Sequence, residues 1–228
     1  MRYFLGGVCI IVVLALAAFG YSALFAPKAP PAFTPIEVGL DGFAKKTLKI
    51  GEIDAIYDTE TALTINGDEN SALKVVVFYD YNCPYCMIEE AALDEALSGR
   101  EDVRVILRPV PFLGDDSFEL AKLAMAAARL GIFPEFHDVI FNALGKMNLD
   151  RALTLLEEAN IPTGELAQLS TDSLVRSAVE ENHRLAIEIG AHYVPAFVIG
   201  KRLYMPLDRD TSPDEFQDMF DQEILNER

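Results

Sequence analysis

The fold is decided by the stretch Val75-Val76-Val77-Phe78-Tyr79-Asp80-Tyr81-Asn82-Cys83-Pro84-Tyr85-Cys86. Its first five residues form an apolar run without alternation, which is typical of a central strand covered on both faces. The next segment, Met87 to Leu97, has apolar residues at helical spacing. Cys83 and Cys86 therefore lie where a strand passes into a helix. Because a helix N-terminus stabilises a thiolate, we predict a reactive nucleophile with a resolving partner beside it.

The composition favours one folded domain with appendages. The chain has 228 residues, of which 51% are hydrophobic, and this is enough for a sizeable core. Its formal net charge of −17 would repel phosphate backbones and anionic lipid headgroups. We therefore expect no nucleic-acid partner.

The N-terminal segment, residues 1–26, is predicted to be a signal anchor or transmembrane helix. Residues 3–26 carry no charged side chain, and only Arg2 and the amino terminus precede them. The stretch is long enough to span a bilayer, which favours an uncleaved anchor. The alternative is cleavage at Ala15-Leu16-Ala17, which would release a soluble domain.

The cysteine content favours redox chemistry. Cys9 lies inside the apolar segment, so Cys83 and Cys86 are the only thiols of the part predicted to be exported. An exported protein whose two cysteines form a C-x-x-C motif uses them for redox chemistry more often than as a structural disulfide.

Residues 27–60 are predicted to be a proline-rich linker and an N-terminal arm. Four prolines between Pro27 and Pro35 favour a stiff, extended spacer. Ile50, Ile53 and Ile56 are spaced as on a helix. Packing against the domain and oligomerisation both remain open as roles for this arm.

Residues 61–228 carry the pattern of an α/β domain. The predicted strands are Ala62–Ile65, Leu73–Tyr79, Val103–Arg108, Ala196–Ile199 and Arg202–Met205. Between about residues 115 and 190 the apolar residues follow helical spacing in four blocks, which are Asp116–Leu130, Pro134–Leu144, Leu149–Ala159 and Thr171–Ile189. Ser212-Pro213-Asp214-Glu215 is the start signal of a closing helix. This order predicts a thioredoxin-like fold with an inserted helical subdomain, preceded by the N-terminal anchor or signal helix.

The active-site stretch, residues 78–86, resembles that of the exported DsbA-like thiol:disulfide oxidoreductases. The resemblance covers about residues 60 to 225 and includes Val103 to Pro111, Glu135-Phe136-His137-Asp138 and Val194-Pro195-Ala196-Phe197. It implies a redox-active disulfide between Cys83, the exposed nucleophile, and Cys86, the buried resolving thiol. It also implies that Pro195 is a catalytic cis-proline opposite them, and that Val194 presents its backbone to an extended substrate peptide. No cofactor and no metal are implied.

Several neighbours are expected to tune the pair. Pro84 removes an N–H donor and Tyr85 adds a phenol, and both affect the redox potential. Many relatives carry a buried glutamate six residues before the first cysteine, where this chain has Val77. Proton transfer from Cys86 then needs water or another acid. Asp80 is the candidate, and its other interpretation is a loop acid near a strand end.

Two histidines are also candidates. His192 precedes Pro195 by three residues and could face the active site as an imidazolium, or lie in a solvated loop. For His137, local packing is favoured over contact with the sulfurs.

The predicted function is to introduce disulfides into reduced exported proteins, with a membrane redox partner that reoxidises the pair. The chain would act on the periplasmic side of the inner membrane, attached by its N-terminal helix, or as a soluble periplasmic protein. The alternative is an isomerase or reductase kept reduced by a membrane partner. A zinc half-site lacks a second ligand cluster, and a non-enzymatic binding module remains the weakest option.

Overall fold

The computed structural model describes residues 37–38, 43–57, 63–206 and 210–226. The predicted N-terminal anchor and the proline-rich linker lie outside these residues. Within the described ranges, no helix is both long and apolar enough to cross a bilayer.

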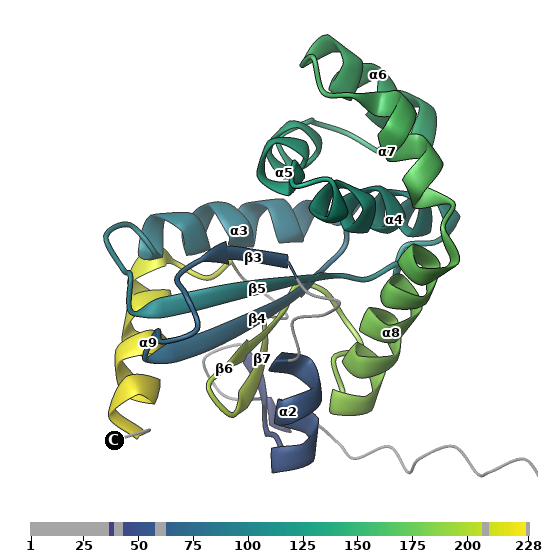
Figure 1. Ribbon diagram of the computed structural model, residues 1–228. Helices are drawn as coiled ribbons and strands as arrows, with labels where there is room; N and C mark the ends of the chain where they lie inside the picture. Colours follow the sequence, from purple (N-terminus) through teal and green to yellow (C-terminus); the bar gives the residue numbers. More distant parts are fainter. Residues whose placement is uncertain (1–36, 39–42, 58–62, 207–209, 227–228) are drawn as a thin grey trace, which may run out of the picture. The chain divides into compact units, whose positions relative to one another are not determined.

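The described residues form a seven-stranded sheet with helices on both faces (Figure 1). The strands are β1 (Glu37–Val38), β2 (Phe43–Thr47), β3 (Leu63–Asn66), β4 (Leu73–Tyr79), β5 (Val103–Pro109), β6 (Ala196–Ile199) and β7 (Arg202–Pro206). Their order in the sheet is β1-β2-β7-β6-β4-β5-β3. Only the β4–β5 pair among these is parallel, as predicted for a β-α-β unit. Each of the five predicted strands is present to within one residue at either end.

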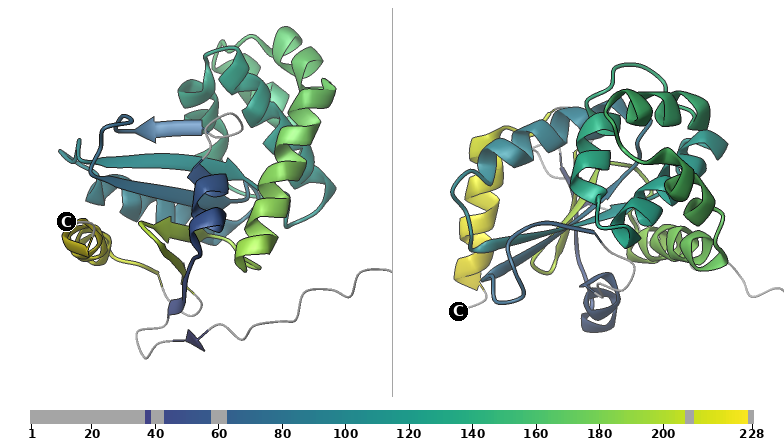
Figure 2. Two further views of the ribbon diagram at one scale, coloured as in Figure 1. Left: turned by 60° about the horizontal axis from the view of Figure 1, so that its bottom comes forward. Right: turned by 45° about the horizontal axis from the view of Figure 1, so that its top comes forward.

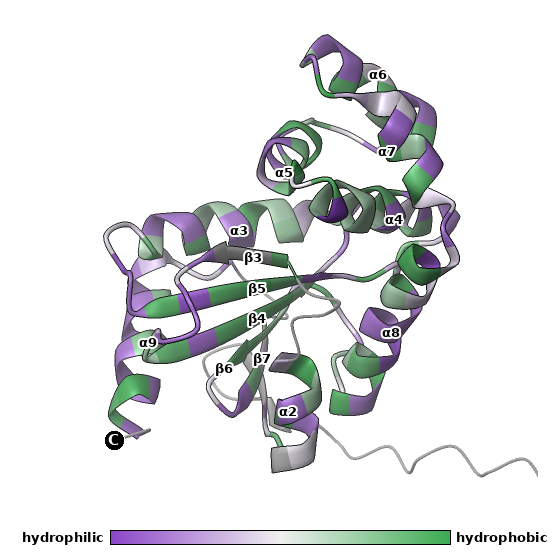
Figure 3. Cartoon of the chain, viewed as in Figure 1, coloured by the Kyte–Doolittle hydropathy of each residue, from purple (hydrophilic) through white to green (hydrophobic). Residues whose placement is uncertain are grey.

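The central strand β4 divides its side chains between two core clusters. Val75, Val77 and Tyr79 pack on one face, while Val76 and Phe78 pack on the other. Apolar residues on both faces explain why its sequence shows no alternation. Figure 3 shows that β4 and β5 are mostly hydrophobic with a few hydrophilic interruptions, whereas hydrophobic and hydrophilic residues are mixed along the helices around them.

Different helices cover the two faces. The first face is covered by α3 (Pro84–Ala96), α9 (Pro213–Asn226) and the start of the insertion. The other face is covered by α2 (Ile50–Tyr57) and the last turns of α8 (Ser173–Ile189). Figure 2 shows α9 lying beside α3, and α2 beside α8.

The insertion contains five helices, one more than the sequence predicts. They are α4 (Asp115–Arg129), α5 (Phe133–Phe141), α6 (Leu149–Glu158), α7 (Thr163–Ser170) and α8. The missed helix is α7, because Pro162 and Gly164 look like loop residues. Pro162 instead is the N-cap residue, and only Leu166 and Ser170 of the helix are buried. With a single buried apolar side chain, α7 has no apolar stripe from which it could have been recognised.

The N-terminal arm packs against the domain where it is described. β2 pairs antiparallel with β7, although its two lysines, Lys45 and Lys46, do not resemble a strand pattern. α2 is held at its C-terminal end by the fully buried Arg108 of β5. That guanidinium donates to the carbonyls of Ile56 at 2.9 Å and Ala55 at 3.4 Å, where the helix dipole favours a cation.

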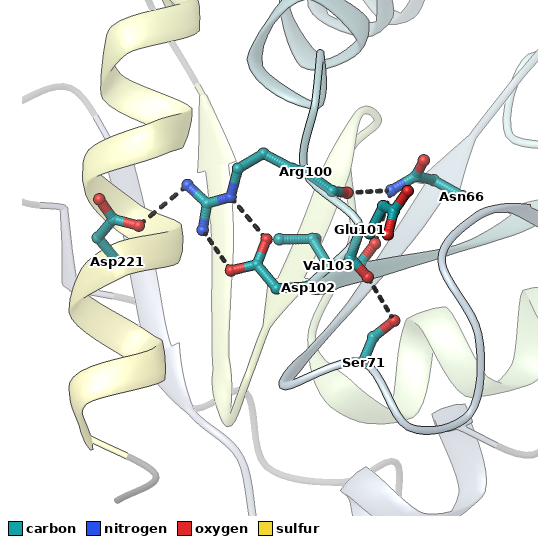
Figure 4. Close-up of polar contacts among 7 residues, drawn as sticks. All are labelled: Asn66, Ser71, Arg100, Glu101, Asp102, Val103 and Asp221. Atoms are coloured by element: carbon teal, nitrogen blue, oxygen red, sulfur yellow. Dashed lines mark hydrogen bonds and ion pairs between the residues drawn. The ribbon is translucent and has the colours of Figure 1, made fainter.

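The closing helix α9 begins with the predicted capping box. Ser212 N–H donates to Glu215 Oε2 at 2.9 Å, and Glu215 N–H donates to Ser212 Oγ at 3.3 Å. Arg100, in the turn after α3, forms ion pairs with Asp102 at 2.7 Å and with Asp221 of α9 at 2.9 Å (Figure 4). These contacts tie α9 to the turn between α3 and β5.

Candidate active site

The C-x-x-C motif lies at the N-terminus of α3. Cys83 is the N-cap residue, in an extended conformation, and Pro84 is the first helical residue. Pro84 costs the helix nothing at this position, because an N–H there has no partner within the helix. The turn before the helix is closed by Cys83 N–H, which donates to the Asp80 carbonyl at 3.0 Å.

The two thiols are both reduced, and their pKa values are shifted in opposite directions. The pKa of Cys83 lies below its usual 9.0, first because the Cys86 thiol hydrogen-bonds to it and then because of the N–H groups of Cys86 and Tyr85; burial opposes them. Burial raises the pKa of Cys86 well above 9.0, and its side chain is 2% exposed. The expectation that Cys83 is exposed is wrong for this structure: the residue is 5% exposed, and its thiol lies against the Val194 carbonyl. Its lowered pKa, rather than exposure, suits Cys83 to be the nucleophile, and Cys86 is the more deeply buried partner.

The loop opposite the thiols contains the expected cis-proline. The Val194–Pro195 peptide bond is cis. The Cys83 thiol donates to the Val194 carbonyl, with Sγ and O separated by 3.5 Å. Pro195 is buried and Val194 half-buried. The structure therefore brings together the four residues that the resemblance places at the catalytic centre.

Asp80 is a buried acid with a structural role that the sequence does not reveal. It is 1% exposed, and its carboxylate accepts from Asn82 N–H at 2.8 Å and Leu113 N–H at 2.9 Å. Burial raises its pKa, against the effect of these donors. Its charge in turn raises the pKa of both Cys83 and Cys86. Asp80 thus joins the active-site turn to the loop after β5 and disfavours both thiolates.

Large apolar side chains are exposed on three segments around the thiols. Tyr85 of the motif is 63% exposed, Leu113 after β5 is 54% exposed, and Tyr193 in the loop before Pro195 is 65% exposed. His192 is exposed beside Tyr193, and its part in tuning remains a prediction.

Asn82 is a site residue that the sequence analysis missed. Its Nδ2 donates to the Met147 carbonyl at 3.0 Å, and its Oδ1 accepts from Met147 N–H at 2.7 Å. Met147 lies between α5 and α6, so this reciprocal pair fastens the helical insertion to the residue before Cys83. A polar residue before a cysteine carries no signal for a partner 65 positions away.

His137 belongs to a buried chain of hydrogen bonds. Tyr79 hydroxyl donates to Tyr81 hydroxyl at 3.0 Å, Tyr81 hydroxyl contacts His137 Nδ1 at 3.0 Å, and His137 Nε2 contacts Glu90 Oε1 at 2.6 Å. The imidazole also stacks on Phe141, with centroids 4.8 Å apart. Local packing was the expected role, and this polar chain adds to it.

A metal centre finds no support in the described part of the chain. No three His, Cys, Asp or Glu side chains of these residues are grouped so that they could hold an ion. What the arrangement can do is exchange a thiol for a disulfide, through an activated thiolate at a helix N-terminus with a buried second thiol and a cis-proline loop opposite.

The fold and this site define the class: a thioredoxin-fold thiol–disulfide oxidoreductase. Residues 74–220 match the DSBA-like thioredoxin domain family, and the chain belongs to that family.

Solved structures agree with this assignment. A thioredoxin-like oxidoreductase from Silicibacter pomeroyi DSS-3 is 27% identical, with a TM-score of 0.68 over 74% of this chain and 95% of that one. The catalytic domain of Proteus mirabilis ScsC (21% identical, TM-score 0.67, 77% and 96% covered) and the thiol-disulfide exchange protein alpha-DsbA2 from Wolbachia pipientis (22%, 0.67, 75% and 91%) share the fold.

A curated relative is much longer than this chain. The Na(+)/H(+) antiporter NhaA of Herminiimonas arsenicoxydans is 25% identical over 150 residues, which are 64% of this chain and 24% of the antiporter. The chain thus matches only about a quarter of the length of that relative.

Proposed function

We propose that this chain introduces disulfide bonds into reduced exported proteins. The observation that carries the proposal is the asymmetry of the thiols: the pKa of Cys83 is lowered at the start of α3 while that of Cys86 is raised. A thiolate that is stabilised in the reduced protein makes the corresponding disulfide a better oxidant. The site therefore favours transfer of its disulfide to a substrate.

The reaction starts from the oxidised pair. A substrate thiolate attacks the Cys83 sulfur, the Cys83–Cys86 bond breaks, and Cys86 leaves as a thiolate that takes up a proton. A second substrate thiolate then attacks the substrate sulfur of the mixed disulfide, and Cys83 leaves as the stabilised thiolate. The substrate loses two electrons and two protons. The pair gains both electrons and one proton, on Cys86, and the other proton goes to solvent while Cys83 remains a thiolate.

Substrate binding is assigned to the surroundings of Cys83. An extended peptide would pair with the backbone of Val194, next to the cis-proline. Tyr85, Leu113 and Tyr193 are exposed around the thiols, and they would hold apolar side chains of an unfolded segment. Such contacts suit substrates that have not yet folded.

The cellular setting is part of the proposal. The uncharged N-terminal stretch supports export and attachment to the inner membrane, with the domain in the periplasm, and cleavage of that stretch would leave the domain soluble there. A membrane redox partner would accept the two electrons of the reduced pair. In the isomerase or reductase alternative, a membrane partner would instead supply electrons.

The test is disulfide formation in a reduced, unfolded protein that has two cysteines. The oxidised chain should form the substrate disulfide stoichiometrically, and Cys83→Ala should abolish the reaction. Cys86→Ser, first loaded at Cys83 as the mixed disulfide with glutathione, should exchange the glutathione for a substrate thiol. Unchanged disulfide formation by Cys83→Ala would contradict the proposal. Thiol trapping in cells then distinguishes the two functions. The Cys83–Cys86 pair of an oxidase is found oxidised, whereas that of an isomerase or reductase is found reduced.

A further inference from the structure

The resolving thiol has a proton-transfer problem. Cys86 must become a thiolate before it can attack a mixed disulfide on Cys83, but burial raises its pKa. Val77, six residues before Cys83, is a buried hydrocarbon that cannot accept a proton. An acceptor must therefore come from elsewhere in the structure.

A chain of buried polar groups leads away from the region of Cys86. It consists of Tyr79, Tyr81, His137 and Glu90, which we call the relay. Its hydrogen bonds share one direction in one of the two tautomers of the neutral imidazole. Tyr79 donates to Tyr81, and in the imidazole tautomer that carries its proton on Nε2, Tyr81 donates to His137 Nδ1 and Nε2 donates to Glu90 Oε1.

The inner end of the relay is coupled to Cys86. Tyr79 and Cys86 belong to the same buried cluster, at the end of β4 and in the first turn of α3. The negative charge of Cys86 contributes to the raised pKa of Tyr79, after burial, the Tyr81 hydroxyl and the Glu90 charge. The structure shows no hydrogen bond between the Cys86 thiol and the Tyr79 hydroxyl, so the proton would pass between them through one water. Glu90, at the other end of the relay, lies one helical turn after Cys86 on α3.

The outer end of the relay is acidic and nearer to solvent. Glu90 lies on α3, and its side chain is 15% exposed compared with 7% for His137. Asp94, one turn further along α3, has its pKa raised to about 6, by burial and then by the Glu90 charge. Asp138 of α5 also raises the Asp94 pKa, whereas His137 lowers it. A proton that arrives at His137 is therefore surrounded by carboxylates.

We propose that the relay takes up the Cys86 proton when this thiol attacks a mixed disulfide on Cys83, and returns it in the reverse step. The inference rests on the proposed function, because it assigns the proton path of the same thiol pair. As Cys86 loses its proton through a bridging water to Tyr79, Tyr79 passes its own proton to Tyr81, and Tyr81 passes its own to His137 Nδ1. The result is a Cys86 thiolate and an imidazolium paired with Glu90, with no tyrosinate left behind.

The sulfur chemistry of this step balances. The Cys86 thiolate bonds to the Cys83 sulfur, the bond from Cys83 to the bound thiol breaks, and that thiol leaves as a thiolate. Cys86 is oxidised, the Cys83 sulfur stays at the disulfide oxidation level, and the leaving thiol is reduced. In substrate oxidation the same path runs backwards, and the relay returns a proton to Cys86 as it leaves.

Packing is the rival explanation of the relay. Tyr81 makes edge contacts with Phe136 and Phe141, so its ring supports the core whatever its hydroxyl does. Tyr81→Phe keeps the ring and removes only the hydroxyl that joins Tyr79 to His137. Tyr57→Phe is the matched control, because the Tyr57 hydroxyl bonds to the carbonyls of Lys74 and Gly200, in the region where β4 begins rather than where the thiols lie.

The experiment is a single turnover of the reduced protein with glutathione disulfide. Cys83 first takes one glutathione, and Cys86 then expels it, and both phases are followed by rapid acid quench and mass spectrometry across pH. We expect Tyr81→Phe to slow the second phase at least tenfold near neutral pH, with its rate rising in proportion to hydroxide. The first phase and the Cys83 thiolate titration should match wild type, as should both phases in Tyr57→Phe.

Tyr79→Phe provides a second variant with the same expectation. Wild-type rates and pH profiles for the second phase in both tyrosine variants would overturn the relay, and so would an equal slowing at every pH, which indicates disturbed packing. A slow second phase in Asp80→Asn alone would assign the proton to Asp80 instead. Failure of Cys83 to form the mixed disulfide in wild type would contradict the proposed function, a result distinct from all of these.

Discussion

At the residue scale, the chemistry depends on the balance of groups around two sulfur atoms. Hydrogen bonds from Cys86 and from the start of α3 lower the pKa of Cys83, while burial and the Asp80 charge raise it. Neither the contributions that lower the Cys83 pKa nor those that raise it can be read from the C-P-Y-C motif. The redox behaviour is set by how deeply the turn packs and where Asp80 points.

Asp80→Asn should lower the pKa of Cys83 further, because it removes a negative charge that disfavours the thiolate. We expect the midpoint of the thiolate titration, followed by the ultraviolet absorbance of the thiolate, to lie at a lower pH than in wild type. A group whose pKa is depressed on folding contributes stability that is present above its unfolded pKa and lost as pH falls through its folded pKa. The reduced variant should therefore keep this contribution to a lower pH than wild type.

The matched control for this prediction is Asp68→Asn. Asp68 also accepts a backbone N–H, that of Asn70, but in an exposed turn before β4. Its substitution should leave the thiolate titration unchanged. A titration of Asp80→Asn that overlays wild type would show that the Asp80 charge does not reach Cys83.

At the element scale, the insertion is hydrogen-bonded to the active-site segment in addition to packing on the domain. Asn82 binds both backbone groups of Met147, and His137 of α5 reaches Glu90 of α3. The loop that positions Cys83 therefore depends on helices far away in the sequence.

Asn82→Ala should lower the free energy of unfolding of the reduced protein by about 2 kcal/mol, because it leaves the buried N–H and carbonyl of Met147 without their partner. Urea denaturation measures the change. The control is Asn142→Ala, which removes an exposed bond to the Asp138 carbonyl and should cost under about 0.5 kcal/mol. Equal costs in the two variants would mean that the contact with Met147 is not specially important.

At the scale of the whole molecule, the net charge of −17 acts on every encounter with a substrate. Two cysteine peptides of identical sequence except for flanking lysines or glutamates should differ in their rate of reaction with the oxidised protein. We expect the cationic peptide to react about tenfold faster at low salt. The difference should shrink towards 1 M salt, where the screening length is about 3 Å.

Rates of both peptides with an uncharged small disulfide correct for the effect of the flanking charges on the thiols themselves. After this correction, a rate ratio that does not depend on salt would exclude long-range steering. The peptides would then be distinguished by contacts at the site alone.

The sequence predicts much of the fold because the decisive elements carry strong local patterns. β4 is recognisable from its apolar run, and α9 from its capping box, since both signals are local. β2 and α7 are missed for the opposite reason. β2 is stabilised by its pairing with β7, and α7 buries a single apolar side chain, Leu166.

The sequence by itself determined the class of chemistry: two cysteines at a strand-to-helix junction, with a proline loop far along the chain that resembles a known partner of such a motif. Only the tertiary structure decided which acids and hydroxyls surround them. Asp80 is buried against Leu113, and Tyr79 connects through Tyr81 to a histidine on another helix. Motifs are local and can be recognised in the sequence alone, whereas hydrogen bonds and charge effects depend on distances that exist only once the chain has folded.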